Sequence, residues 1–161
     1  MVKAPIQAFN TSVQFDIITL WHYLEHDYQV QHTIDKLHGL LVTGGKLIIE
    51  VPDYQSITAR RQGGFWQGWH SPRHLSLFSQ KSFELLFDDQ KLQIVKHQRH
   101  GTMDAFTLWW LGKMEKKGIN WAGSMEDEFW PLVFLKVITF PLFLFEKVFP
   151  FGIQLLVIEK K

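Results

Sequence analysis

Two short apolar segments, separated by a segment with helical spacing, constrain the fold of this chain more than any other feature. Residues 15–21, FDIITLW, are β-branched and aromatic with little polar interruption, as expected of a strand buried on both faces. Residues 28–41 carry apolar side chains at spacings of four, three and four, which predicts an amphipathic helix that ends at Gly44-Gly45. Residues 46–51, KLIIEV, predict a second strand. Because a strand, a helix and a strand of this length form one crossover, we expect the two strands to be parallel.

The same alternation of strand and helix patterns continues to the end of the chain. Helices are predicted at 56–62, 79–89 and 103–117, strands at 92–98 and 152–159, a loop at 118–125 and an aromatic helical region at 129–151. We therefore predict an α/β fold in a single domain, residues 1–161. Residues 103–150 would form a helical aromatic insertion or lid before the last strand.

Length and composition narrow the functional classes. The chain has 161 residues, 46% of them apolar, which is enough for one hydrophobic core. Seventeen Lys and Arg residues against 16 Asp and Glu give a net charge of +1 without a basic stripe, so we expect no nucleic-acid partner. The lack of cysteine excludes disulfides and thiolate metal sites, and it suits a cytoplasmic location.

Aromatic residues are unusually abundant, with seven Trp and 14 Phe. Many fall in residues 129–151, FWPLVFLKVITFPLFLFEKVFPF, where three charged residues and three prolines interrupt the apolar sequence. A membrane-spanning helix needs about 20 predominantly apolar residues, so we expect no transmembrane span. The segment instead predicts a buried or interfacial helical hairpin, and its apolar surface is compatible with peripheral contact with a membrane.

The sequence HYLEH, residues 22–26, fits the H-x-x-E-H pattern of inverted zinc peptidases. On a helix this spacing would place His22 and His26 on one face, with Glu25 as a general base. However, His22 directly follows the first predicted strand, where no helix is expected. We therefore predict no metal site, and keep as an alternative a zinc hydrolase that uses His22, Glu25 and His26.

Polar and aromatic side chains follow the carboxyl ends of the two predicted parallel strands. Leu20, Trp21 and His22 end the first strand, Pro52 follows the second, and an aromatic loop at 65–74 comes next. Open α/β sheets bind ligands outside the carboxyl ends of their parallel strands. The sequence thus predicts a mostly apolar cleft with a few convergent polar groups at this end of the sheet.

Three blocks in this region resemble class I S-adenosylmethionine-dependent methyltransferases of the type-11 and type-23 subgroup. They are FDIITLWHYLEH, LLVTGGKLIIEVPD and FWQGWHSPRHLSLFSQKSFELLF, in family order. The resemblance covers only the C-terminal half of the family's domain. It implies half of a Rossmann-like sheet, strands four to seven with the last strand antiparallel, and helices on both faces. It also implies S-adenosyl-L-methionine as cofactor and methyl transfer to a small-molecule or lipid-like acceptor.

The resemblance also implies site residues, although it assigns none of them as catalytic. The residues facing the methionine and sulfonium part of the cofactor would be Leu20, Trp21 and His22. The substrate pocket would be formed by Glu25, His26, Trp66, His70, Arg73 and His74. For Arg73, a structural contact with Asp53 or Glu50 that fixes the loop is an equal alternative.

Two cofactor-binding features of the family are not found in the sequence: the Gly-rich loop after its first strand and the acidic residue that ends its second. The family's sheet order is 3-2-1-4-5-7-6, so strand four, residues 15–20 here, would have an exposed edge. We therefore expect either a fragment of a longer enzyme, inactive or weak alone, or a remnant that self-associates through this edge. The alternative is a non-catalytic, degenerate methyltransferase fold that self-associates or pairs with another chain.

Overall fold

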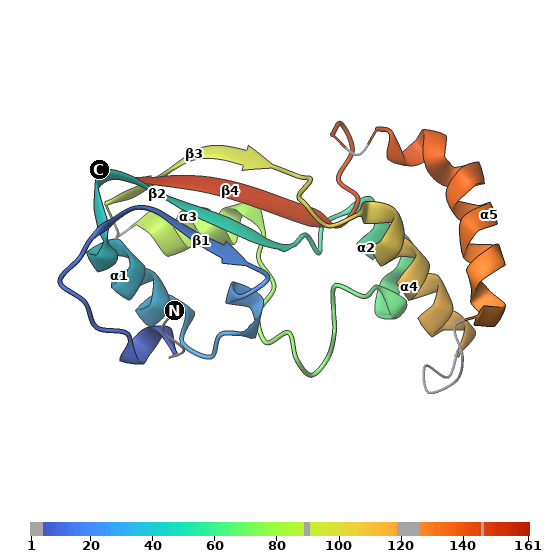
Figure 1. The fold of residues 1–161 in the computed structure, drawn as a ribbon, viewed down its shortest axis with the longest axis horizontal. Coiled ribbons are helices and arrows are strands. Elements are labelled where there is room, and N and C mark those ends of the chain that lie inside the picture. The colour runs from blue at the N-terminus through green and yellow to red at the C-terminus, as the bar shows by residue number, and fades with distance from the viewer. Residues whose placement is uncertain (1–4, 89–90, 119–125, 146) are drawn as a thin grey trace.

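The computed structural model describes residues 5–88, 91–118, 126–145 and 147–161 (Figure 1). The strands are β1 (Phe15–Trp21), β2 (Leu41–Pro52), β3 (Leu92–Gln98) and β4 (Ile153–Lys160). The helices are α1 (Val30–Leu40), α2 (Ile57–Gln62), α3 (Gln80–Asp88), α4 (Ala105–Lys117) and α5 (Glu126–Phe143). Single 3-10 turns lie at Ile6–Ala8, Leu24–His26 and Gly63–Phe65. The predicted loop at 118–125 lies outside the described residues except for Gly118.

The four strands form one mixed sheet in the order β1-β2-β4-β3. β1 and β2 are parallel, as predicted, with Ile18 opposite Leu47 and Trp21 opposite Glu50. β4 runs antiparallel to both of its neighbours, β2 and β3. This order is the 4-5-7-6 half of the sheet that the family resemblance implied, and β1 lies at an edge.

The prediction that Gly44-Gly45 ends the first helix is wrong, because the helix ends at Leu40 and β2 begins at the next residue. The two glycines lie inside β2, at a bulge where Phe15 pairs with Leu41 but Ile17 pairs with Lys46. Gly44 has φ +79°, and a Cβ on Gly45 would lie 2.8 Å from the Val42 carbonyl oxygen. The bulge therefore requires glycine at both positions.

The main core lies between one face of the sheet and the helices α1 and α3, which cover it together (Figure 1). Alternate residues of β2, Leu47, Ile49 and Val51, are fully buried against this layer. α1 contributes Ile34 and Leu37, whose spacing of three residues keeps them on one helix face. The apolar residues that give this segment its helical periodicity thus form the packing face of α1.

The opposite face of β1 is open, which corrects the prediction of a strand buried on both faces. Ile18 and Leu20 pack on the core, whereas Ile17 and Trp21 on the other face are 60% and 45% exposed. The described helices leave this face of β1 uncovered. Both helices that pack on the strands lie on the same side, and no described segment covers Ile17.

α4 and α5 lie beyond the carboxyl ends of the parallel strands, between β3 and β4 in sequence (Figure 1). A second apolar cluster joins Phe106 and Trp110 of α4 to Phe143 of α5 and to Phe151. The predicted hairpin at 129–151 is wrong, because α5 continues through Pro131 to Phe143 as one helix. The role of residues 103–150 as a lid stays a prediction.

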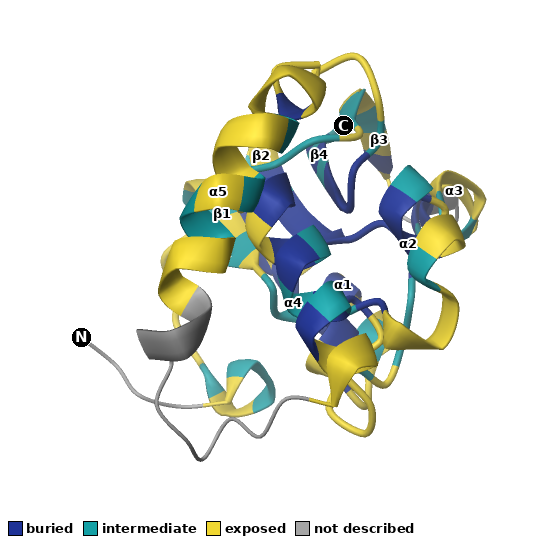
Figure 2. Cartoon of the chain, turned by 90° about the vertical axis from the view of Figure 1, so that its right-hand side faces the viewer, coloured by how far each residue is buried: buried dark blue, intermediate teal, exposed yellow. Residues whose placement is uncertain are grey.

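The outer side of α5 is largely exposed and apolar (Figure 2). Its large exposed side chains include Phe129, Trp130, Phe134, Val137, Ile138, Phe140 and Leu142. None of the described helices combines the length and hydropathy that crossing a bilayer requires.

The loop after α2 is packed around a buried indole. Trp66 is 1% exposed and meets Trp69 edge to face at 5.5 Å. Gly68 lies directly under the Trp66 ring, because a Cβ there would be 2.2 Å from two ring atoms. This close packing holds the loop against the body of the domain.

We expect Gly68→Ala to lower the free energy of unfolding by about 1–3 kcal/mol, since the added methyl group overpacks the site under Trp66. Urea unfolding measures this change. Gly64→Ala is the matched control on the same loop, because a Cβ at Gly64 meets no atom within 4 Å. The control should change stability by no more than about 0.5 kcal/mol, and equal effects of the two substitutions would contradict the packing described.

Candidate functional site

A cavity of about 270 Å³ lies at the carboxyl ends of β1 and β2. Five residues that the sequence singled out line it: His22, Glu25, His26, His70 and His74. Its apolar wall includes Met103, which precedes α4, and Leu108 and Leu111 of α4 itself. The structure therefore brings two histidine pairs from distant segments together in one partly apolar pocket.

His22 is placed by an unusual backbone conformation directly after β1. Its φ is +48°, and its N–H donates to the Glu50 carbonyl oxygen at 3.0 Å, which extends the pairing of β1 with β2. The left-handed conformation then turns the chain out of the strand and toward the 3-10 turn at Leu24–His26. The His22 ring then lies close to Glu25 of that turn and to Glu50 of β2.

The His22 imidazole bridges two carboxylates that are fully buried. Its Nδ1 lies 3.3 Å from Glu25 Oε1, and its Nε2 lies 3.1 Å from Glu50 Oε1. The close contact with Glu25 and the negative charges of both carboxylates raise the pKa of His22, although burial opposes the shift. The charged imidazolium is therefore favoured at this position.

The buried Glu50 carboxylate has several hydrogen-bond partners. Besides His22, it accepts from the Thr102 N–H at 2.7 Å and from the Thr102 hydroxyl at 2.8 Å. The loop that carries Thr102 can approach because residue 101 is glycine: a Cβ there would lie 2.6 Å from Glu50 Oε2. Glu50 thus ties β2 to the segment that leads into α4.

Glu25 has a different environment, since neither carboxylate oxygen accepts a well-oriented hydrogen bond from the residues described here. His22 Nδ1 is near, and His74 Nε2 lies at 4.0 Å. The backbone of Glu25 is well held, because its carbonyl oxygen accepts from the N–H groups of Leu75 at 2.7 Å and Ser76 at 3.2 Å. The carboxylate is therefore fixed in a buried position while its oxygens remain available.

Two imidazoles flank the Glu25 carboxylate. His74 Nδ1 donates to the Gly68 carbonyl oxygen at 2.7 Å, and His26 Nδ1 donates to the Arg73 carbonyl oxygen at 3.0 Å. The two rings meet edge to face at 4.7 Å. Burial lowers the pKa of His74, so its neutral form is favoured, with a lone pair on Nε2.

The other predicted site residues do not line this cavity. Leu20 packs on the main core, and Trp21 lies on the open face of β1. Trp66 is buried inside its loop, and Arg73 is exposed and contributes its carbonyl oxygen to His26.

The helical geometry that the zinc-peptidase pattern requires is not formed by residues 22–26. His22 follows a strand in a left-handed conformation, and only Leu24–His26 form a single 3-10 turn. Both ring nitrogens of His22 face carboxylates, so it cannot act with His26 as an i, i+4 ligand pair. The basis of the zinc-hydrolase alternative is therefore wrong.

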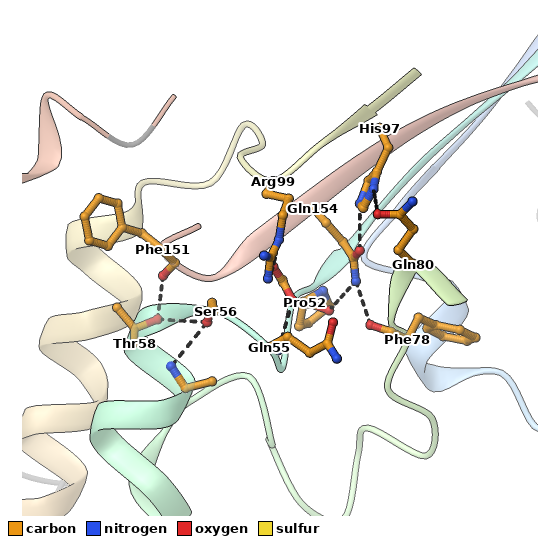
Figure 3. A network of polar contacts seen from close by, with 12 residues as sticks. Pro52, Gln55, Ser56, Thr58, Phe78, Gln80, His97, Arg99, Phe151 and Gln154 are labelled. Atoms are coloured by element: carbon orange, nitrogen blue, oxygen red, sulfur yellow. Dashed lines mark hydrogen bonds and ion pairs between the residues drawn. The ribbon is translucent and has the colours of Figure 1, made fainter. Parts of the chain in front are cut away.

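The alternative for Arg73, an ion pair with Asp53 or Glu50, is also wrong. Asp53 is held by Arg99, which donates from Nε at 2.8 Å and from Nη2 at 2.6 Å, and Figure 3 shows the surrounding network. In the same network Gln154 of β4 donates to the Phe78 carbonyl oxygen at 2.7 Å. Gln154 also donates to the Pro52 carbonyl oxygen at 3.3 Å, so the network fixes the carboxyl end of β2 against β4 and the end of β3.

Sequence reasoning missed Glu50, Thr102 and the apolar wall from α4 as parts of the site. One signal was present: a glutamate near the end of the apolar run KLIIEV is a charged residue in a buried strand. Thr102 and α4 reach the site through contacts between segments far apart in the sequence, and the sequence holds no comparable signal for these contacts.

A family model described as "Methyltransferase domain" matches residues 3–97 of the chain. Solved structures with the same fold include a Bacillus halodurans C-125 protein assigned as a methyltransferase, at 11% identity and TM-score 0.56, covering 99% of this chain and 70% of that one. The [4+2]-cyclase SpnF matches at 11% identity and TM-score 0.52, covering 98% and 54%. No curated protein matches the chain.

A third match is the O-methyltransferase from a trans-AT PKS multienzyme of Brevibacillus brevis, solved with S-adenosyl-L-homocysteine. It is 10% identical, with a TM-score of 0.50, and the match covers 98% of this chain and 48% of that one. The chain thus covers only 48–70% of the length of these three structures. The family match over residues 3–97 and the sheet order together show that this chain belongs to the S-adenosylmethionine-dependent methyltransferase family and forms part of its Rossmann-like domain.

Proposed function

We propose that this chain supplies the acceptor-side part of a methyltransferase that transfers a methyl group from S-adenosyl-L-methionine to a small or lipid-like acceptor. The observation that carries the proposal is the position of the cavity at the carboxyl ends of β1 and β2. Parallel α/β sheets bind their ligands at this end.

The proposed contact with the cofactor lies at the carboxyl end of β1. Trp21 is 45% exposed there, directly before His22. An exposed indole provides a face for the positively charged sulfonium group, because a cation is attracted to the centre of an aromatic ring. Trp21 and His22 form the proposed contact with the methionine end of the cofactor, and Leu20, whose side chain packs on the main core, takes part through its backbone.

No side chain is proposed as a general base. Methyl transfer from a sulfonium already has a good leaving group, so holding donor and acceptor in line supplies much of the acceleration. The histidines and carboxylates of the cavity are proposed to position the acceptor beside the cofactor.

The lipid-like acceptor is favoured by apolar surface close to the cavity. Leu108 and Leu111 of α4 line the cavity, and α5, which packs on α4, exposes large aromatic side chains such as Trp130 (74%) and Phe134 (65%). Apolar patches of this kind on a protein surface mark binding to other apolar surfaces. We propose that α5 makes the peripheral contact with a membrane from which the acceptor is taken.

We expect S-adenosylhomocysteine to bind the chain weakly, with a Kd of about 1 mM or higher, corresponding to about −4 kcal/mol. The reason is that no Gly-rich loop is present in this sequence to hold the rest of the cofactor. A titration followed by ¹⁵N-resolved NMR should shift the resonances of Leu20, Trp21 and His22. Trp21→Ala should abolish these shifts, whereas Trp130→Ala should not. Submicromolar binding, or shifts that spare residues 20–22, would refute this assignment.

We expect the double variant Trp130→Ser, Phe134→Ser to partition at least about tenfold less onto phosphatidylglycerol vesicles than the unchanged chain, since each buried aromatic side chain contributes about 1.5–3 kcal/mol. Co-sedimentation measures the partitioning. Leu85→Ser on α3 is the control, because Leu85 is 67% exposed and lies on the helical layer that covers one face of the sheet, outside α5. Membrane contact through α5 is excluded if the double variant and the control sediment alike.

The open edge of the sheet favours a second candidate function, a non-catalytic module that pairs through β1. An edge strand presents unpaired backbone N–H and C=O groups, and here the exposed Ile17 adds apolar surface beside them. In this alternative the fold is retained for assembly with a second copy or with another chain, and no methyl transfer takes place.

We expect the chain to self-associate and Ile17→Lys to shift it toward monomer, because a lysine on an edge strand opposes strand pairing. Size-exclusion chromatography with light scattering reports the mass over a range of concentrations. Val95→Lys is the matched control: Val95 is 48% exposed and lies on β3, at the opposite edge of the sheet. A monomeric unchanged chain, or an equal response to both lysines, would argue against pairing through β1.

A further inference from the structure

Three metal-ligating side chains converge in the cavity from two segments far apart in the sequence. Glu25 and His26 come from the 3-10 turn after β1, and His74 comes from the loop before α3. One carboxylate oxygen and two imidazole nitrogens of this cluster all lie within 4.8 Å of one another. Positioning an acceptor, the role proposed above for the polar side chains of the cavity, does not require that three metal-ligating atoms converge so closely.

The orientation of both imidazoles is set for ligation through Nε2. Each ring donates its Nδ1–H to a backbone carbonyl oxygen, His74 to Gly68 at 2.7 Å and His26 to Arg73 at 3.0 Å. Hydrogen bonds of this kind fix the tautomer and leave the Nε2 lone pair free, and metal-bound histidines almost always have such a partner.

The Glu25 carboxylate supplies the second, independent observation. It is 0% exposed, and neither of its oxygens accepts a hydrogen bond from any described residue. Its nearest partner, the His22 imidazole at 3.3 Å, is shared with the equally buried Glu50. A buried carboxylate beside two nitrogen lone pairs is costly unless a cation lies among them.

We propose that Glu25, His26 and His74 bind a divalent transition-metal cation, of which Zn²⁺ is the best fit. Two imidazoles and a carboxylate are a ligand set typical of zinc. Zinc bonds of about 2.0–2.1 Å place tetrahedral ligands about 3.3 Å apart. A small movement of the exposed His26 side chain, with its hydrogen bond to Arg73 kept, closes the larger separations present here.

The proposed site differs from the one that the HYLEH pattern suggests. His22 is excluded because both of its nitrogens already face carboxylates, and the third ligand comes instead from His74 in the loop. Three protein ligands leave a fourth position, and the cavity that all three residues line would give water or an acceptor oxygen access to it.

The test is a titration of the chelator-treated 161-residue chain with Zn²⁺ by calorimetry and with Co²⁺ by visible absorption. We expect one Zn²⁺ per chain and the intense visible bands of four-coordinate Co²⁺. His26→Gln should weaken Zn²⁺ binding by more than about 100-fold, beyond the 10–100-fold typical of a residue that only orients a ligand. His26 is exposed, so its replacement leaves the core intact.

His32→Gln is the matched control, because His32 is an exposed imidazole on α1, outside the cluster. It should bind Zn²⁺ as tightly as the unchanged chain. A second readout is the thermal midpoint, which added Zn²⁺ should raise in the unchanged chain and in His32→Gln but not in His26→Gln. Absence of Zn²⁺ binding by the unchanged chain, or equal binding by both variants, overturns the proposal.

Discussion

The contact on which the carboxyl end of this sheet depends is the His22 imidazole between two buried carboxylates. Breaking a buried ion pair by removing one partner typically costs about 3–5 kcal/mol, and here one partner serves both Glu25 and Glu50. Through Glu50 the contact reaches Thr102 and α4, and through the Glu25 backbone it reaches Leu75 and the aromatic loop. An edge strand with one open face is thus anchored firmly at the end where the cavity forms.

The strands and helices of the domain could largely be predicted from the sequence, because their periodicity comes from packing on a single face. The apolar spacing in α1 and the β-branched runs of β1 and β2 are local properties. The burial of β1 could not be predicted. Ile17 is as apolar as Ile18, and only the position of a covering layer decides which of the two is exposed.

The location of the site followed from the topology, but its chemistry did not. Parallel strands place residues 20–22 and residue 52 at one end of the sheet, as expected. The left-handed conformation of His22 determines which partners its ring reaches, and a single sequence does not show that conformation. The Nδ1 contacts of His26 and His74 likewise depend on carbonyl groups of a loop whose path is set by tertiary packing around Trp66.

The glycine bulge in β2 has a consequence for charge as well as for shape. Relative to β1, the bulge inserts an odd number of residues between Leu41 and Lys46. It therefore determines which face of the sheet each later side chain of β2 points to. Leu47 and Ile49 consequently face the core, while Glu50 faces the opposite side. Loss of a single residue from the bulge would exchange these two faces. An apolar side chain would then stand where His22 meets its counter-ion, and a carboxylate would enter the core.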